Sequence, residues 1–435
     1  MIRAGLKSLR RMIYAACLLA LLVCGAEVGI RAYEAITGSP VCSATDGICS
    51  DPSKLTIPSW SFHQELRPSS TAIVECRDTH SEISIETNSL GLRGPEPANP
   101  KPIDVCRVVV LGDETIYAPE TPEKDHFCEL LKQQLQQHTM AKIEVINAGI
   151  PGHCPLTEFM FFKQRLLGLK PDLVLLHFDW SDVADDRAIR RYVRCDQAGA
   201  PQTCPHCKLL ASNKAKPCHE VWRQQFRLMD WVLNNLSTEW KYQLARQKAI
   251  SREADTNPYA WLREEHPEQN QAFRHAVRPV ADIARLCQAE HCQLAILTSP
   301  KPWQVSSKCS RGQGVRLSSG VAREAYFPNR APFEVLGSFA NRAKIPLFDG
   351  SSVLLAGKDN EANFLKHAPR WSQQGHQKMA DAVASFVMEK VPGAWNSPYF
   401  QKRDQPLSRM RANEPEIQRT SGQGPAPVRG PRHAQ

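Results

Sequence analysis

Five short apolar runs constrain the fold of this chain more than any other feature. They cover residues 108–111, 143–148, 172–178, 293–298 and 345–348, and the segments between several of them carry apolar residues at helical spacing. Strands that alternate with helices and short loops predict a parallel sheet covered by helices. The carboxyl ends of parallel strands meet at one edge of the sheet, where open α/β sheets place their chemistry. Residues directly after the runs are therefore candidates for a functional site.

Four segments carry recognisable motifs: Gly112-Asp113-Glu114, the TNSLGLRG segment at 87–94, the NAGIPG turn at 147–152 and the RWSQQGH segment at 370–376. Together they resemble the motifs of the SGNH, or GDSL-like, hydrolases. The resemblance covers roughly residues 83–390. It implies a three-layer α/β/α sandwich of the flavodoxin-like kind, here over residues 83–396. It also implies ester hydrolysis by a Ser nucleophile, oxyanion donors from Gly and Asn, and a His base.

Most of the catalytic positions that the resemblance implies are replaced. Glu114 stands at the nucleophile position, Ser181 replaces the oxyanion Asn, and Arg370 and His367 replace the His base and its Asp, while Gly152 is retained. A carboxylate opposes the charge of an oxyanion, and Arg cannot act as a base. Ester hydrolysis by the family mechanism is therefore not expected. The flanking acids are Asp113 and Asp182.

The replacements suggest three interpretations of the site. Glu114 and Arg370 would be neighbours in an SGNH site, so one hypothesis is a pseudo-hydrolase pocket locked by their ion pair. A second is a decayed site in which both are solvated surface charges. A third, weaker interpretation is a rearranged acid/base centre that uses His367 and Asp182.

The N-terminus has the layout of a signal-anchor. Basic residues within positions 1–11 precede an apolar stretch over residues 12–30, which predicts one membrane-spanning helix with the main domain outside the cytoplasm. A cleaved signal peptide and a buried N-terminal helix are the alternatives. Residues 31–82 read as a linker or irregular cap, and the Pro-, Gly- and Arg-rich tail 397–435 as disordered.

Cysteine usage fits an oxidising compartment. The chain has 15 cysteines, and the pairs Cys42 with Cys49 and Cys287 with Cys292 are close enough in sequence to form disulfides. A helical, Cys-rich insertion over 183–290 adds six potential metal ligands: Cys195, Cys204, His206, Cys207, Cys218 and His219. Zinc suits this spacing, but outside the cytoplasm disulfides are the preferred interpretation. A helix with apolar residues from Trp222 to Trp240 follows.

The net charge of +9 is spread along the chain without a recognition motif, so we expect no nucleic-acid partner. No cofactor is expected. The preferred function is a non-catalytic, membrane-anchored SGNH-like protein of the cell envelope that binds an acylated glycan or an envelope protein. The alternatives are an ester hydrolase or acyltransferase with a rearranged site, and a structural surface module held by disulfides.

Overall fold

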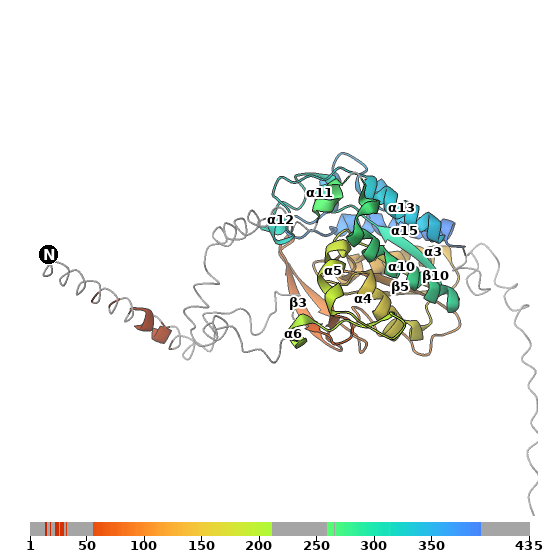
Figure 1. Cartoon of the computed structure of the whole chain (residues 1–435), viewed down its shortest axis with the longest axis horizontal. Helices are drawn as coiled ribbons and strands as arrows, with labels where there is room; N and C mark the ends of the chain where they lie inside the picture. Colours follow the sequence, from red (N-terminus) through yellow and green to blue (C-terminus); the bar gives the residue numbers. More distant parts are fainter. Residues whose placement is uncertain are drawn as a thin grey trace, which may run out of the picture.

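The computed structural model describes residues 55–210 and 259–392, except 265 and 313, together with a few helical positions between residues 14 and 32. Figure 1 shows residues 55–210 and 259–392 as one body around a central sheet. The elements of this sheet follow the apolar runs of the sequence closely.

The central sheet has five parallel strands in the order β6-β5-β7-β10-β11. The strands are β5 (Val105–Gly112), β6 (Lys142–Gly149), β7 (Leu173–Phe178), β10 (Gln293–Thr298) and β11 (Leu347–Asp349). Every residue of β5 and β7 is buried, as expected for parallel strands covered on both faces. Counted along the chain, the order is 2-1-3-4-5, which is the flavodoxin-like arrangement.

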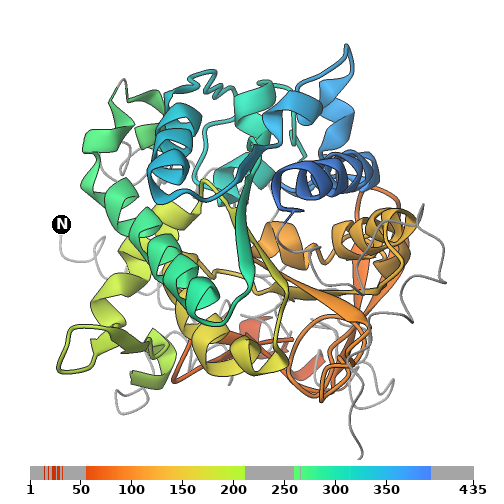
Figure 2. The ribbon, with the colours of Figure 1, turned by 90° about the vertical axis from the view of Figure 1, so that its right-hand side faces the viewer.

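Helices cover both faces of the sheet and create two cores (Figure 2). On one face lie α3 (Phe127–His138) and α15 (Gln373–Lys390), which pack on Val108, Val110 and neighbouring strand residues. On the other face lie α4 (Pro155–Phe161), α5 (Asp182–Ile189), α10 (Gln271–Ala289) and α13 (Ala331–Ala343), which pack on Val109, Leu111 and their neighbours. Alternate residues of each strand thus feed opposite cores. The predicted three-layer α/β/α sandwich is confirmed.

Three small antiparallel pairs flank the sandwich: β1 (Thr56–Pro58) with β2 (Gln64–Leu66), β3 (Thr71–Cys76) with β4 (Ser81–Glu86), and β8 (Arg194–Cys195) with β9 (Pro201–Thr203). Short helices are α2 (Glu114–Tyr117), α6 (Cys207–Leu210), α11 (Pro302–Val305), α12 (Val315–Ser318) and α14 (Ser351–Leu354). Single turns of 3-10 or π helix occupy Glu123–Asp125, Phe162–Leu166, Leu167–Leu169, Arg190–Tyr192, Ala260–Arg263, Pro267–Gln269 and Asn360–Asn363.

Several predicted segments differ from the structure or lie outside its described residues. The segment 55–82, expected to be irregular, forms β1, β2 and β3 and begins β4, because its apolar residues Leu55, Phe62, Leu66 and Val74 are buried against the sandwich. The Trp222–Trp240 helix and the tail 397–435 lie outside the described residues, as does most of the predicted anchor. Where the structure describes the chain, no helix is both long and apolar enough to span a membrane.

Candidate functional site

The candidate site lies at the carboxyl edge of the sheet, where β5, β6 and β7 end. Strand β5 ends at Gly112, Asp113 caps helix α2 by accepting a hydrogen bond from the Thr115 backbone N–H (2.8 Å), and Glu114 is the first residue of that helix. The turn after β6 packs closely on α2, since a Cβ atom on Gly149 would lie 2.5 Å from the backbone nitrogen of Tyr117. Glycine at this position therefore lets the two loops meet.

Glu114 uses the backbone donor that the SGNH resemblance assigns to the oxyanion. The N–H of Gly152 donates to Oε1 of Glu114 at 3.1 Å. Burial and the negative charge of Asp113 raise the pKa of Glu114 to about 7, against the opposing charges of Arg370 and Lys301. The protein's own carboxyl group thus occupies the donor that would stabilise a developing oxyanion.

The hydroxyl of Ser181, which replaces the oxyanion Asn, contacts two carboxylates. Its Oγ donates to Oδ1 of Asp179 at 2.7 Å and also lies 3.1 Å from Oδ2 of Asp113. A hydroxyl has one proton, and both partners here are acceptors when ionised. Ser181 would therefore have to leave these carboxylates to reach an oxyanion. Asp182, the first residue of α5, is fully buried and accepts from the N–H of Asp179 at 2.9 Å.

Arg370 and His367 pair with acids other than those predicted. Arg370 forms a two-pronged ion pair with Glu120, one bond of which measures 2.8 Å from Nε to Oε2. The predicted Glu114–Arg370 ion pair is wrong. Arg370 instead donates from Nε and Nη2 to the carboxylate of Glu120, which lies in the loop after α2. Nδ1 of His367 lies 2.8 Å from Oδ1 of Asp78 in the β3–β4 turn, and His367 is half-exposed. His367 lines the same cavity as Glu114 and Arg370, but the carboxylate that it contacts is Asp78.

A buried ion pair, which the sequence did not reveal as part of the site, lies beneath these residues. Nζ of Lys301 is 2.6 Å from Oδ2 of Asp179, and Thr115 Oγ1 donates to the same oxygen at 3.0 Å. Burial would raise the pKa of Asp179, but Lys301 and other partners lower it to about 2. Burial would likewise lower the pKa of Lys301, but Asp179 raises it above its ordinary value. The lysine lies three residues after the end of β10, and this position near the carboxyl edge of the sheet was the available signal.

A buried serine–histidine pair also escaped the sequence analysis. Nε2 of His177, near the end of β7, lies 3.1 Å from Oγ of Ser299, just after β10. Both residues are buried, and the ring of Trp371 packs edge-on against His177 with centroids 5.3 Å apart. Burial lowers the pKa of His177, so its imidazole is neutral near pH 7. A polar residue inside an apolar strand was the sequence signal for this position.

A cavity of about 590 Å³ opens above the site. Its polar lining includes Asp113, Glu114, Ser181, Asp185, Lys301 and Arg370. Ser318 and Ser319 of the α12 region also line it, but both hydroxyls donate to the carbonyl of Val315. Among the described residues that line this cavity, no serine or cysteine is hydrogen-bonded to a histidine. Within this described lining, no serine or cysteine is therefore activated by histidine as nucleophilic catalysis of the SGNH kind requires.

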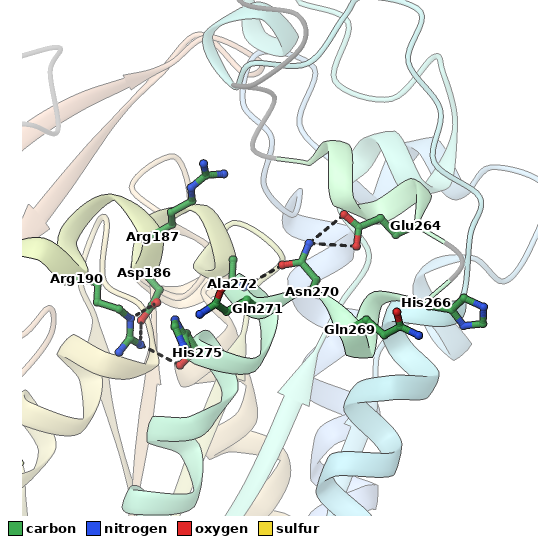
Figure 3. Close-up of a pocket in the computed structure, with 10 residues that line it drawn as sticks. All are labelled: Asp186, Arg187, Arg190, Glu264, His266, Gln269, Asn270, Gln271, Ala272 and His275. Carbon is green, nitrogen blue, oxygen red and sulfur yellow. Dashed lines mark hydrogen bonds and ion pairs between the residues drawn. The ribbon is translucent and has the colours of Figure 1, made fainter.

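A second cavity, of about 900 Å³, lies beside the start of α10 (Figure 3). Several of its polar side chains already pair with one another. Arg190 pairs with Asp186, and Asn270 both caps α10 and bonds Glu264 at 2.9 Å. In Figure 3 the side chains of Arg187 and His266 point away from these pairs. This open cavity contains none of the positions that the resemblance assigned.

The predicted cysteine and histidine ligands are only partly described. Cys195 and Cys207 are exposed, whereas Cys204 is buried with its Sγ 3.7 Å from the carbonyl oxygen of Ile189. His206 stacks on His63 with ring centroids 4.5 Å apart. These described ligands do not form a converging group of three, and Cys218 and His219 lie outside the described residues. Zinc binding by the full set stays a prediction.

None of the described cysteines is in a disulfide. Cys287 and Cys292 are neighbouring thiols joined by a hydrogen bond, which raises the pKa of Cys287 and lowers that of Cys292. They are close, as the sequence spacing suggested, but not covalently linked. Cys42 and Cys49 lie outside the described residues.

The strand order and the positions of the NAGIPG turn, Glu114 and the RWSQQGH segment agree with the resemblance noted above. The chain has an SGNH/GDSL hydrolase-like fold. No protein-family model matches the chain, and no curated protein matches it either. Similar solved structures include the lipase/acylhydrolase from Enterococcus faecalis, at 10% identity over 65% of this chain and 95% of that chain, with a TM-score of 0.35.

Two further structures are comparable. A GDSL-like lipase from Bacteroides thetaiotaomicron VPI-5482 is 11% identical over 67% of this chain and 92% of its own, with a TM-score of 0.33. An acetyl xylan esterase is 14% identical over 65% of this chain and 99% of its own, with a TM-score of 0.34. These likenesses are distant and carry no information about the activity of this chain.

Proposed function

We propose that this chain is a non-hydrolytic SGNH-like protein whose cavity binds an acylated glycan or a similar polyhydroxylated ligand. The observation that carries the proposal is the 3.1 Å hydrogen bond from Gly152 to Glu114. It fills the oxyanion donor position with a carboxyl group of the protein itself. Serine-type ester hydrolysis needs this donor free and a hydroxyl activated by histidine, and the cavity offers neither.

The lining of the cavity favours a hydroxyl-rich ligand. Carboxyl groups of Glu114 and Asp185 can accept hydrogen bonds from hydroxyl groups, and the cations Lys301 and Arg370 can donate to carbonyl oxygens. A volume of about 590 Å³ is within the range of small-molecule sites. The basic N-terminus followed by an apolar stretch supports placement of the protein on a membrane, with this domain on the outer side.

Binding is tested with a cavity-filling substitution and a matched control on one helix. Ala184 of α5 lines the cavity, while Ala188 of the same helix is exposed. Isothermal titration calorimetry with an O-acetylated xylo-oligosaccharide should show binding by the wild-type chain and by Ala188→Leu. The Ala184→Leu variant should bind at least about tenfold more weakly, since a loss of roughly 1.4 kcal/mol in binding free energy raises the Kd tenfold.

Acetate in the titration cell is measured in parallel. The proposal expects the acetyl groups to remain on the sugar. Absence of binding, or equal binding by Ala184→Leu and Ala188→Leu, contradicts the assigned cavity. Acetate release that is lost in Ser299→Ala would instead favour the alternative, an esterase or acyltransferase built on the Ser299–His177 pair.

A further inference from the structure

Asp113, His177 and Asp179 lie together below the cavity. They follow or end the adjacent strands β5 and β7, and each has 2% or less of its surface exposed. One ligand atom from each, a ring nitrogen or a carboxylate oxygen, lies within 4.8 Å of the other two. An imidazole and two carboxylates that converge in this way are a common ligand set for divalent metal ions.

His177 provides an independent observation that points to a ligand. Its Nδ1 is buried and has no hydrogen-bond partner among the described residues, while Nε2 is held 3.1 Å from Ser299 Oγ. With the proton on Nε2, Nδ1 presents a bare lone pair. Histidines that bind metals usually hold their second ring nitrogen in this way, which fixes tautomer and orientation. An unpartnered buried nitrogen is otherwise a net cost to folding.

The two carboxylates are also held in position by hydrogen bonds from neighbouring residues. Asp113 accepts from the Thr115 N–H and has Ser181 Oγ 3.1 Å from its Oδ2, and Asp179 accepts from the N–H and Oγ of Ser181 and from Thr115 Oγ1. Asp113 keeps lone pairs for a metal bond, whereas Oδ2 of Asp179 would bind the ion in exchange for the ammonium of Lys301. Ligating carboxylates are typically held by such outer hydrogen bonds.

The charge balance of the region favours a further cation besides Lys301 and Arg370, which both act on Glu114. Several carboxyl groups act on one another here: Asp113, Glu114, Glu158, Asp179, Asp182 and Asp185. Lys301 pairs directly with Asp179. Both oxygens of Glu158 and Oδ1 of Asp182 have no partner among the described residues. A divalent ion near Asp113 would reduce the repulsion that these buried groups otherwise experience.

We propose that Asp113, His177 and Asp179 bind a divalent transition-metal ion such as Mn²⁺ at the floor of the cavity. Asp113 lines the cavity, which gives the ion a route from solvent. The mixed nitrogen and oxygen set suits Mn²⁺ or Zn²⁺ better than Ca²⁺, which takes oxygen ligands. This site is independent of glycan binding and would remain if that proposal failed.

Mn²⁺ is the probe for the test because it favours oxygen and nitrogen ligands over the thiols of the Cys-rich insertion. The full chain is stripped with chelator and titrated with Mn²⁺. The free ion is followed by its electron paramagnetic resonance signal, and the melting temperature is recorded with and without the ion. The wild-type chain should bind one Mn²⁺ at this site and melt at a higher temperature in its presence.

Variants separate this site from any other. Asp113→Asn keeps an acceptor for the α2 cap but removes a charged ligand, so Mn²⁺ affinity should fall by about 100-fold or more. The control Asp359→Asn removes an exposed carboxylate elsewhere and should leave affinity unchanged. Lys301→Met removes a competing positive charge, so it should tighten Mn²⁺ binding.

The opposite responses of Asp113→Asn and Lys301→Met cannot both come from a general loss of structure. His177→Gln should resemble Asp113→Asn, and if it does not fold, the other two variants decide. The proposal is overturned if the wild-type chain binds no Mn²⁺ at millimolar concentration. It is equally overturned if Asp113→Asn binds like the wild type, or if Lys301→Met weakens binding.

Discussion

Arg93 of the TNSLGLRG segment anchors the loop that carries Glu114. Its guanidinium donates to the carbonyls of Tyr117 (2.7 Å), Ala118 (2.6 Å) and Thr121 (2.6 Å), at and just beyond the end of α2. Its side chain is 1% exposed, and Nε pairs with Glu123 at 3.2 Å. This motif, which implied no chemistry by itself, thus holds the helix that begins with Glu114.

Replacing Arg93 by Met should remove a large part of the stability of the domain. Hydrogen bonds to a charged group contribute about 1.5–3 kcal/mol each, and the abandoned carbonyls of buried residues would lose their partners. Counting three such bonds at the lower end gives a loss of roughly 4–6 kcal/mol. Domains are stable by only about 5–15 kcal/mol, so the variant should be marginal or unfolded. Arg93→Lys, which keeps the charge but not the fork, should lose roughly half as much.

Urea unfolding followed by tryptophan fluorescence gives the free energies of unfolding. The exposed Arg187→Met on α5 serves as a matched control and should change stability by less than about 0.5 kcal/mol. If the free energy of unfolding of Arg93→Met lies within about 1 kcal/mol of the wild-type value, the carbonyls must find other partners. The anchoring role assigned to Arg93 is then refuted.

Three more predictions concern buried groups. Gly149→Ala should lose at least about 2 kcal/mol of stability in urea unfolding, because its Cβ would lie 2.5 Å from the Tyr117 backbone nitrogen, while Gly168→Ala, with open space around it, should not. Burial lowers the pKa of His153 from 6.5 to about 4. The stability that its neutral ring contributes to the fold is therefore complete above pH 6.5 and is lost as the pH falls toward 4. Replacing it by Leu should reduce the loss of stability between pH 7 and pH 5 by about 2 kcal/mol, and an unchanged pH profile contradicts this. Burial raises the pKa of Glu158, so its contribution to stability is complete below its ordinary pKa and falls as the pH rises toward the raised pKa. Glu158→Gln should therefore gain stability over the wild type at pH 8 but not at pH 4, and parallel pH profiles in urea unfolding would contradict this.

The sheet was predictable from the sequence because its signals are local. Apolar runs such as 108–111 and 293–298 became β5 and β10, since a parallel strand that is covered on both faces is apolar at most of its positions. The Gly152 turn was also found where the motif placed it, next to Glu114. The hairpins within 55–82 were missed because their apolar residues are few and their strands are short.

The partners of the site residues were not predictable in the same way. Arg370 could have paired with either of two acids on the α2 segment, and only the path of the loop after α2 shows that Glu120 meets the guanidinium. Likewise, nothing local distinguishes Lys301 from a solvated lysine, although it ends in a buried pair with Asp179. Long-range pairing depends on how loops from distant strands meet, which residue spacing does not encode.

The most direct test of the account is ester hydrolysis by the full chain. Short-chain p-nitrophenyl esters are offered to the wild type, to Ser299→Ala, and to a variant that carries Glu114→Ser, Ser181→Asn and Arg370→His. The account predicts no turnover above the buffer rate by the wild type, since Glu114 occupies the Gly152 donor and no serine among the described lining residues is hydrogen-bonded to a histidine. Turnover by the wild type that disappears in Ser299→Ala would contradict it and assign catalysis to the buried Ser299–His177 pair.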